Sequence, residues 1–100
     1  MDVRKLRDYC LNPEHPRGRH KARVFVSVLG LTADDAHDLR VALLAAARVN
    51  EAQVAGRDEY GSRYVLDFDL SGPEGSARVC SSWIVRTTED FPRLTSCYVL

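Results

Sequence analysis

Residues 64–87 read YVLDFDLSGPEGSARVCSSWIVRT, which contains two strand patterns separated by a turn. Apolar and polar residues alternate along residues 64–70, which is the period of a strand with one buried face. Ser71-Gly72-Pro73-Glu74-Gly75 is a cluster of turn-forming residues. Residues 77–87 give a second apolar run, in which we expect Trp83 to anchor the core. This stretch therefore predicts an antiparallel hairpin.

Two further strands flank this hairpin. Residues 51–59 predict a weaker strand before it, linked to it by a turn at Tyr60-Gly61. Glu89-Asp90-Phe91-Pro92 turns the chain again, and residues 93–100 predict the last strand. Strands that are joined by short turns pair in sequence order, so we expect a four-stranded antiparallel meander.

The segment at residues 20–29 fits two structures. Its valines favour a strand by propensity, namely Val24, Val26 and Val28. A second set of apolar residues marks one face of a helix instead, namely Ala22, Phe25, Val28 and Leu29. Because Gly30 is a good residue to end a helix, we predict a helix here.

The helices on either side have clearer signals. Residues 2–11 predict a short helix with Asp2 as its N-cap, ended by Asn12-Pro13. Thr32 is the predicted N-cap of a longer helix that ends near residue 50. The expected fold is therefore α+β: about three N-terminal helices packed on the meander sheet, in a single domain of residues 1–100.

Composition argues against a strongly basic protein of the kind that often binds nucleic acid. The 100 residues include 14 Lys plus Arg and 14 Asp plus Glu, so the net charge is zero. The charge is uneven, however: residues 1–30 carry seven positive and three negative residues, whereas residues 31–60 carry three and six. The N-terminal part could face an anion, although ordinary surface solvation explains the same asymmetry.

The cysteines and the hydrophobic pattern predict no metal, cofactor or membrane segment. Cys10, Cys80 and Cys97 lack the CxxC spacing of a zinc site, and their odd number argues against a disulfide framework. We expect Cys80 and Cys97 to be buried strand residues. The sequence has no signal peptide and no membrane-spanning run, so we expect a cytoplasmic protein.

A basic segment at residues 12–22 is the first candidate for chemistry. His15 lies in a proline-flanked loop, where it could act as a general acid or base, or could simply make a loop hydrogen bond. Lys21 and His20 lie near a predicted helix start and could contact a phosphate. The alternative for Lys21 and His20 is a solvated helix start. Arg17 and Arg19, with Gly18 between them, could wrap a phosphate, although this segment lacks the glycines of a P-loop.

The last strand is the second candidate. Ser96 and Tyr98 are two residues apart, so they face the same side of the strand and could donate hydrogen bonds to phosphate oxygens. The alternative is an ordinary strand of mixed polarity. Arg93 could stabilise the charge of a pentavalent phosphorane, or could pair with Asp90 or Glu89 instead.

Motifs along nearly the whole chain resemble a bacterial family of small uncharacterised domains, found as stand-alone proteins and as C-terminal tips of polymorphic toxins. In chain order they are Lys5-Leu6-Arg7-Asp8-Tyr9, Asn12-Pro13-Glu14-His15-Pro16, Gly18, Lys21-Ala22, Tyr60-Gly61, Tyr64-Val65, Gly72-Pro73, Trp83-Ile84 and Pro92-Arg93-Leu94. The arrangement is similar to the barnase/EndoU/colicin/RelE group of metal-independent ribonuclease toxins. That family's last strand usually reads threonine, alanine, tyrosine, proline, whereas this chain has Ser96-Cys97-Tyr98-Val99.

The resemblance implies a ribonuclease toxin that cleaves RNA, tRNA included, by attack of the 2′-hydroxyl and that a small antitoxin or immunity-like protein neutralises. It implies catalytic roles for His15, Lys21, Ser96 and Tyr98. Arg17, Arg19, His20 and Arg93 would bind the substrate.

Two other functions fit the sequence. The neutral net charge and the altered last strand favour a non-catalytic module that binds a partner protein. Phosphate or nucleotide binding without cleavage is the third hypothesis, and it would bring Lys21 and Arg93 together while leaving His15 remote. An exposed edge at residues 97–100 would also permit a homodimer through the last strand.

Overall fold

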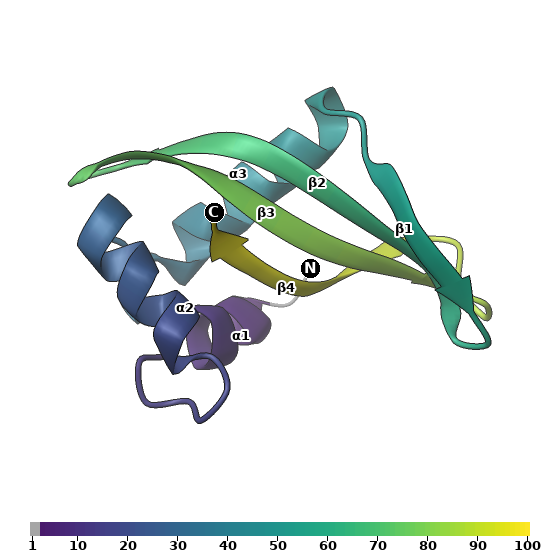
Figure 1. The fold of residues 1–100 in the computed structure, drawn as a ribbon, viewed down its shortest axis with the longest axis horizontal. Coiled ribbons are helices and arrows are strands. Elements are labelled where there is room, and N and C mark those ends of the chain that lie inside the picture. The colour runs from purple at the N-terminus through teal and green to yellow at the C-terminus, as the bar shows by residue number, and fades with distance from the viewer. Residues whose placement is uncertain (1–2) are drawn as a thin grey trace.

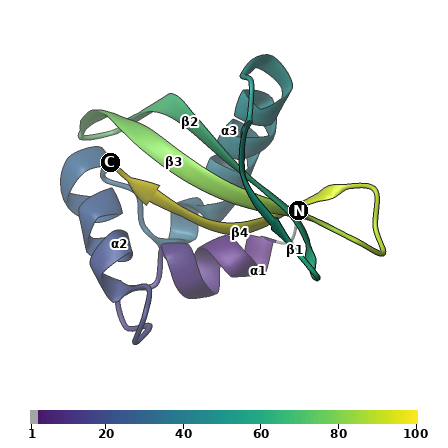
Figure 2. The same ribbon diagram turned by 45° about the vertical axis from the view of Figure 1, so that its right-hand side comes forward.

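A four-stranded antiparallel sheet forms the centre of the computed structural model, which describes residues 3–100. The N-cap predicted at Asp2 therefore lies outside the described residues. Helices pack on one face of the sheet: α1 and α2 lie beside β4, and α3 lies behind β2 and β3 (Figure 1 and Figure 2). The predicted α+β class is confirmed.

The strands follow one another in space in the predicted meander order. They are β1 (Gln53–Asp58), β2 (Gly61–Gly72), β3 (Gly75–Arg86) and β4 (Pro92–Val99). Gly72 pairs with Gly75 across a two-residue turn, which confirms the hairpin expected from residues 64–87. The first strand is shorter than the predicted range of residues 51–59.

The segment at residues 19–29 is helical, as predicted, and consists of α2 (Arg19–Val24) and the π-helical turn η2 (Phe25–Leu29). Its buried face holds Ala22, Phe25 and Leu29. The prediction that Val28 lies on this face is wrong, because Val28 is 37% exposed. The wider π-helical turn places Leu29, not Val28, over the core. Gly30 has φ 71° and ends the helix in the left-handed conformation that glycine favours.

The other helical segments form where the caps and apolar spacing predict them. The first consists of α1 (Val3–Lys5) and the π-helical turn η1 (Leu6–Cys10). Thr32 opens the third with a capping box, in which its hydroxyl accepts from the Asp34 N–H and its own N–H donates to Asp35. The helical turn η3 (Ala33–Asp35) then leads into α3 (Ala36–Val49), whose inner face is apolar. No helix in residues 3–100 is long and apolar enough to cross a membrane.

Ser81 is a polar residue that is completely buried between the sheet and the helices. Its hydroxyl donates to the Leu66 carbonyl at 2.7 Å and accepts from the Trp83 indole Nε1 at 2.9 Å. The expected core role of Trp83 is confirmed, because its side chain belongs to the main buried cluster. Ser81 therefore satisfies the indole N–H inside an apolar core.

We expect Ser81→Ala to lower the free energy of unfolding by about 1–3 kcal/mol, because it leaves the buried Trp83 N–H without its partner. Denaturant unfolding followed by Trp83 fluorescence measures this directly, since the chain has one tryptophan. Ser76→Ala is the control: Ser76 bonds Ser71 on the exposed surface, and its loss should change stability by less than about 0.5 kcal/mol. Equal losses for the two variants would contradict the prediction.

Candidate functional site

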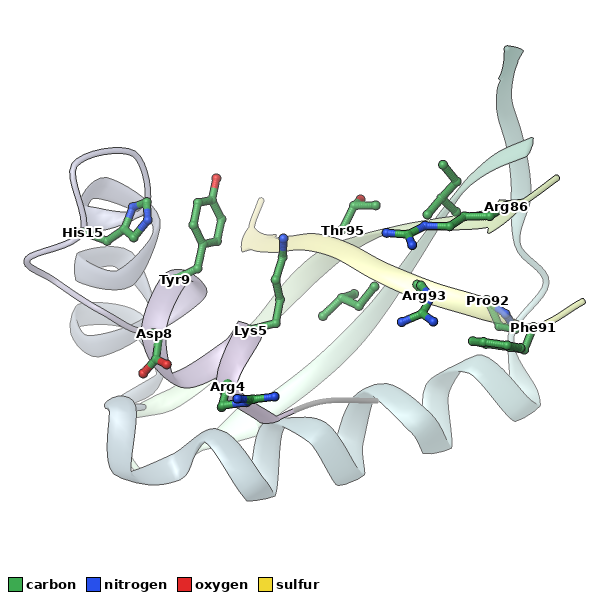
Figure 3. A pocket seen from close by; sticks show the side chains of 12 residues that line it. Arg4, Lys5, Asp8, Tyr9, His15, Arg86, Phe91, Pro92, Arg93 and Thr95 are labelled. Carbon is green, nitrogen blue, oxygen red and sulfur yellow. The ribbon is translucent and has the colours of Figure 1, made fainter. Parts of the chain in front are cut away.

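An open groove of about 860 Å³ lies between the N-terminal helical segment and the ends of β3 and β4. Lys5, Tyr9 and His15 line it from the N-terminal part, and Arg86 and Arg93 line it from the strands (Figure 3). The groove thus brings together residues that are about 80 positions apart, and most of its ionisable lining is basic.

His15 is held by its own loop. Its Nδ1 accepts hydrogen bonds from the backbone N–H groups of Arg17 and Gly18, each at 3.0 Å. In the neutral ring the proton must therefore reside on Nε2, which is left as a donor. The ring also meets Tyr9 edge-on, with 4.7 Å between the ring centroids. The loop hydrogen bond considered as an alternative role is thus present.

Lys21 contacts the other two predicted catalytic residues, Ser96 and Tyr98. Its Nζ donates to the Ser96 hydroxyl at 3.1 Å, which joins α2 to β4. The same Nζ lies 5.6 Å from the centre of the Tyr9 ring and 5.5 Å from the centre of the Tyr98 ring. Aromatic faces at these distances attract the ammonium cation.

Four predicted catalytic residues are therefore connected by contacts. His15 touches Tyr9, Tyr9 lies next to Lys21, and Lys21 reaches Ser96 and Tyr98. Ser96 and Tyr98 share one side of β4, as predicted, because they lie opposite Ser82 and Cys80 on β3. We call Tyr9, His15, Lys21, Ser96 and Tyr98 the Lys21 cluster.

The Tyr98 hydroxyl lies in a polar row across the outer face of the sheet, with Cys80 and Asp67 as its neighbours. Its hydrogen bond with Cys80 raises the pKa of Tyr98 above the usual value, and the nearby Asp67 charge acts in the same direction. Burial raises the pKa of the Cys80 thiol as well. Tyr98 therefore stays protonated at neutral pH and can donate.

Beneath the cluster, Cys10 and Cys97 form a completely buried pair that connects η1 to β4. The Cys97 thiol donates to the Cys10 sulfur, which holds the pKa of Cys10 below its ordinary value. The charges of Lys5 and Lys21 act in the same direction, whereas burial opposes them. Both lysines thus place positive potential at the Cys10 sulfur.

Arg93 lies in the groove with His15, but it already has a partner. Its guanidinium binds both carboxylate oxygens of Glu89, at 2.8 and 2.6 Å, and stacks 4.9 Å from the centre of the Phe91 ring. This hydrogen-bonded pairing lowers the pKa of the Glu89 carboxyl. The alternative Glu89 pairing is therefore present, and a phosphate would have to compete with Glu89 for Arg93.

Of the eight predicted site residues, His15 and Arg93 line the groove. Lys21, Ser96 and Tyr98 do not line it and adjoin it through Tyr9. The other three, all predicted to bind substrate, also lie outside the groove. Arg17, Arg19 and His20 are exposed, and none of them lines it.

Lys5 and Tyr9, which the sequence analysis named only in a family motif and not as site residues, do line the groove. The Lys5 Nζ lies 5.3 Å from the centre of the Tyr9 ring. Their spacing of four residues on a helix was the available signal, because such residues are neighbours on its surface.

Within residues 3–100, no three His, Cys, Asp or Glu side chains gather closely enough to hold a metal ion. A family model for a domain of unknown function (DUF6883) matches residues 1–100, so the chain belongs to that family of uncharacterised domains. No curated protein matches the chain, and no solved structure matches it either.

Proposed function

We propose that this member of the DUF6883 family is a metal-independent ribonuclease toxin whose active site is the Lys21 cluster. The observation that supports this most is the Lys21–Ser96 hydrogen bond, which places an ammonium group between the rings of Tyr9 and Tyr98, with Tyr9 in contact with His15. Cations and aromatic rings in one cluster suit a single-stranded nucleic acid, because phosphates bind the cations and bases stack on rings.

In the proposed reaction the RNA 2′-oxygen attacks the adjacent phosphorus, and the bond from phosphorus to the 5′-oxygen breaks. The 2′-hydroxyl proton passes to solvent, and the leaving 5′-oxygen takes a proton from water, so the products are a 2′,3′-cyclic phosphate and a 5′-hydroxyl. Lys21 stabilises the negative charge that develops on the phosphorane. Ser96 and Tyr98 donate hydrogen bonds to its oxygens.

His15 has a defined part in this scheme. With Nδ1 occupied by the loop, Nε2–H can donate to a phosphate oxygen. For general acid–base catalysis Nε2 must gain and lose its proton, which requires Nδ1 to become protonated and to give up two backbone hydrogen bonds. We therefore propose that His15 is a donor here, and the dependence of the rate on pH distinguishes the two roles.

We propose that the exposed cations bind the RNA backbone on either side of the cleaved bond. Arg17, Arg19 and His20 would bind flanking phosphates, and Arg93 would exchange Glu89 for a phosphate. A small antitoxin or immunity-like protein would cover this surface in the cytoplasm. The homodimer through the last strand stays a prediction.

The test is cleavage of total RNA and bulk tRNA in EDTA, from about pH 6 to about pH 9. We expect cyclic-phosphate ends and a rate that rises with pH throughout, because no residue of the site loses a catalytic proton. A bell-shaped dependence of the rate on pH would show instead that His15 acts as a general acid or base. DNA of the same sequence is the control and must remain intact, since it lacks the 2′-hydroxyl. If the folded protein cleaves neither RNA, the partner-binding module becomes the better hypothesis.

A further inference from the structure

The strand β2 has an edge that no other strand covers. β3 pairs with β2 along its whole length, but β1 pairs with it only between the Gln53–Val65 and Asp58–Gly61 pairs. Within the described residues 3–100, residues 66–72 therefore have no strand neighbour on the β1 side. In Figure 1 this part of β2 forms the border of the sheet beyond β1, with α3 behind it.

The register shows which backbone groups point outward along this edge. Because Gly72 and Gly75 flank a two-residue turn, they exchange hydrogen bonds with each other, and alternate residues of β2 then bond to β3. The N–H and C=O groups of Asp67, Asp69 and Ser71 consequently face the open side. Among the described residues, none of the backbone hydrogen bonds outside helices and strands involves these three.

A groove of about 320 Å³ with a mostly apolar lining runs beside this edge, between α3 and β2. Ala42, Ala45 and Val49 line it from α3, and Phe68 and Leu70 line it from β2. Val49 is 82% exposed, so the groove has apolar surface that nothing in the described chain covers. Its helix side is built largely of alanines, which leave room for another layer of side chains.

The opposite side of the same edge is acidic. Asp67 and Asp69 are exposed on the outer face of the sheet. Within residues 3–100, only Asp69 of the two has an ion pair, with Arg78 at 3.1 Å on the surface, and this pair also borders the groove. A second copy of this chain is a poor occupant, because pairing of two β2 edges about a two-fold axis would set these aspartates against one another. The charge instead complements a strand with basic residues on that side.

We propose that residues 66–72 of β2 bind an extended segment of a different protein, which adds to the sheet as a further strand. Apolar side chains at alternate positions of this segment enter the groove beside α3, and basic side chains between them face Asp67 and Asp69. Its backbone bonds the N–H and C=O groups of Asp67, Asp69 and Ser71. This inference is independent of the proposed ribonuclease activity, since none of these residues belongs to the Lys21 cluster.

The probe is an acetylated, amidated peptide of alternating valine and lysine, added to isotope-labelled protein for amide hydrogen exchange. In the free protein we expect fast exchange at Asp67, Asp69 and Ser71 and slow exchange at Leu66, Phe68 and Leu70. Saturating peptide should slow exchange at the first three amides by about tenfold or more. Protection of these three amides in the peptide-free protein would overturn the proposal.

Two controls separate strand addition from non-specific binding. A peptide N-methylated at the residues that face β2 cannot donate those hydrogen bonds and should give no protection; equal protection would overturn the proposal. Ala45→Glu places a charge in the groove and should weaken binding by about tenfold. Ala47→Glu adds the same charge to an exposed part of α3 outside the groove and should leave binding unchanged. Equal losses in the two variants would show that binding does not depend on the groove and would overturn the proposal.

Discussion

Lys21→Met is expected to lower the rate of RNA cleavage by about 10²–10³-fold, the typical loss when one donor to a developing oxyanion is removed. Methionine keeps an unbranched side chain that can lie between the Tyr9 and Tyr98 rings. It cannot donate to Ser96 or neutralise the phosphorane. Single-turnover kinetics with saturating RNA measures the effect on the chemical step, and denaturant unfolding checks that the variant is folded.

Arg23→Met is the matched control for this experiment. Arg23 lies on the same helix as Lys21 and carries the same charge, but it is exposed and is not part of the Lys21 cluster. Its loss changes only long-range electrostatics, which salt near 0.15 M screens over about 8 Å, so we expect a change of less than about threefold. Similar losses in Arg23→Met and Lys21→Met would show that RNA cleavage depends on total charge and not on the Lys21 cluster.

The fold was predictable because its signals are local. The alternation along residues 64–70, the turn residues that follow and the cap at Thr32 each specify one element within a few positions. The segment at residues 20–29 was ambiguous for a physical reason: its valines favour a strand, whereas tertiary packing of Phe25 and Leu29 stabilises a helix. Val28 was misplaced because apolar spacing does not reveal a π-helical turn.

The candidate site was only partly predictable because it depends on contacts between distant segments. Lys21 and Ser96 were both chosen from the sequence, but nothing local indicates that the side chains, 75 positions apart, share a hydrogen bond. Tyr9 was named in the sequence only within a family motif, yet its ring contacts His15 and lies beside Lys21. The free edge of β2 was equally hidden, because it depends on where the pairing with β1 ends.

The geometry of the Lys21 cluster depends on one close backbone approach. Gly18 lies against the backbone of Tyr9, and a Cβ at this position would lie only 2.2 Å from the Tyr9 carbonyl oxygen. The Gly18 N–H also donates to His15 Nδ1. A single glycine therefore sets how the loop of His15 packs on the helix of Tyr9, and a side chain there must move one backbone segment away from the other.

We expect Gly18→Ala to lower the free energy of unfolding by about 1–3 kcal/mol, because rigid backbone atoms must shift to admit the methyl group. The rate of RNA cleavage should fall further than this, by about 10²-fold, since a displacement of about 1 Å is enough to misplace His15 and Tyr9. Thermal or denaturant unfolding measures the first effect, and kcat/KM at a temperature where the variant is folded measures the second.

Gly56→Ala makes the same substitution where the structure leaves room. No heavy atom lies within 4 Å of a Cβ at Gly56, and its backbone does not adopt a positive φ. We therefore expect its stability to stay within about 0.5 kcal/mol of the parent and its cleavage rate to be unchanged. If Gly18→Ala matched Gly56→Ala in both measurements, the contact with Tyr9 would not organise the site. If it lost stability but kept full activity, the contact would hold the fold together while the positions of His15 and Tyr9 would not limit catalysis.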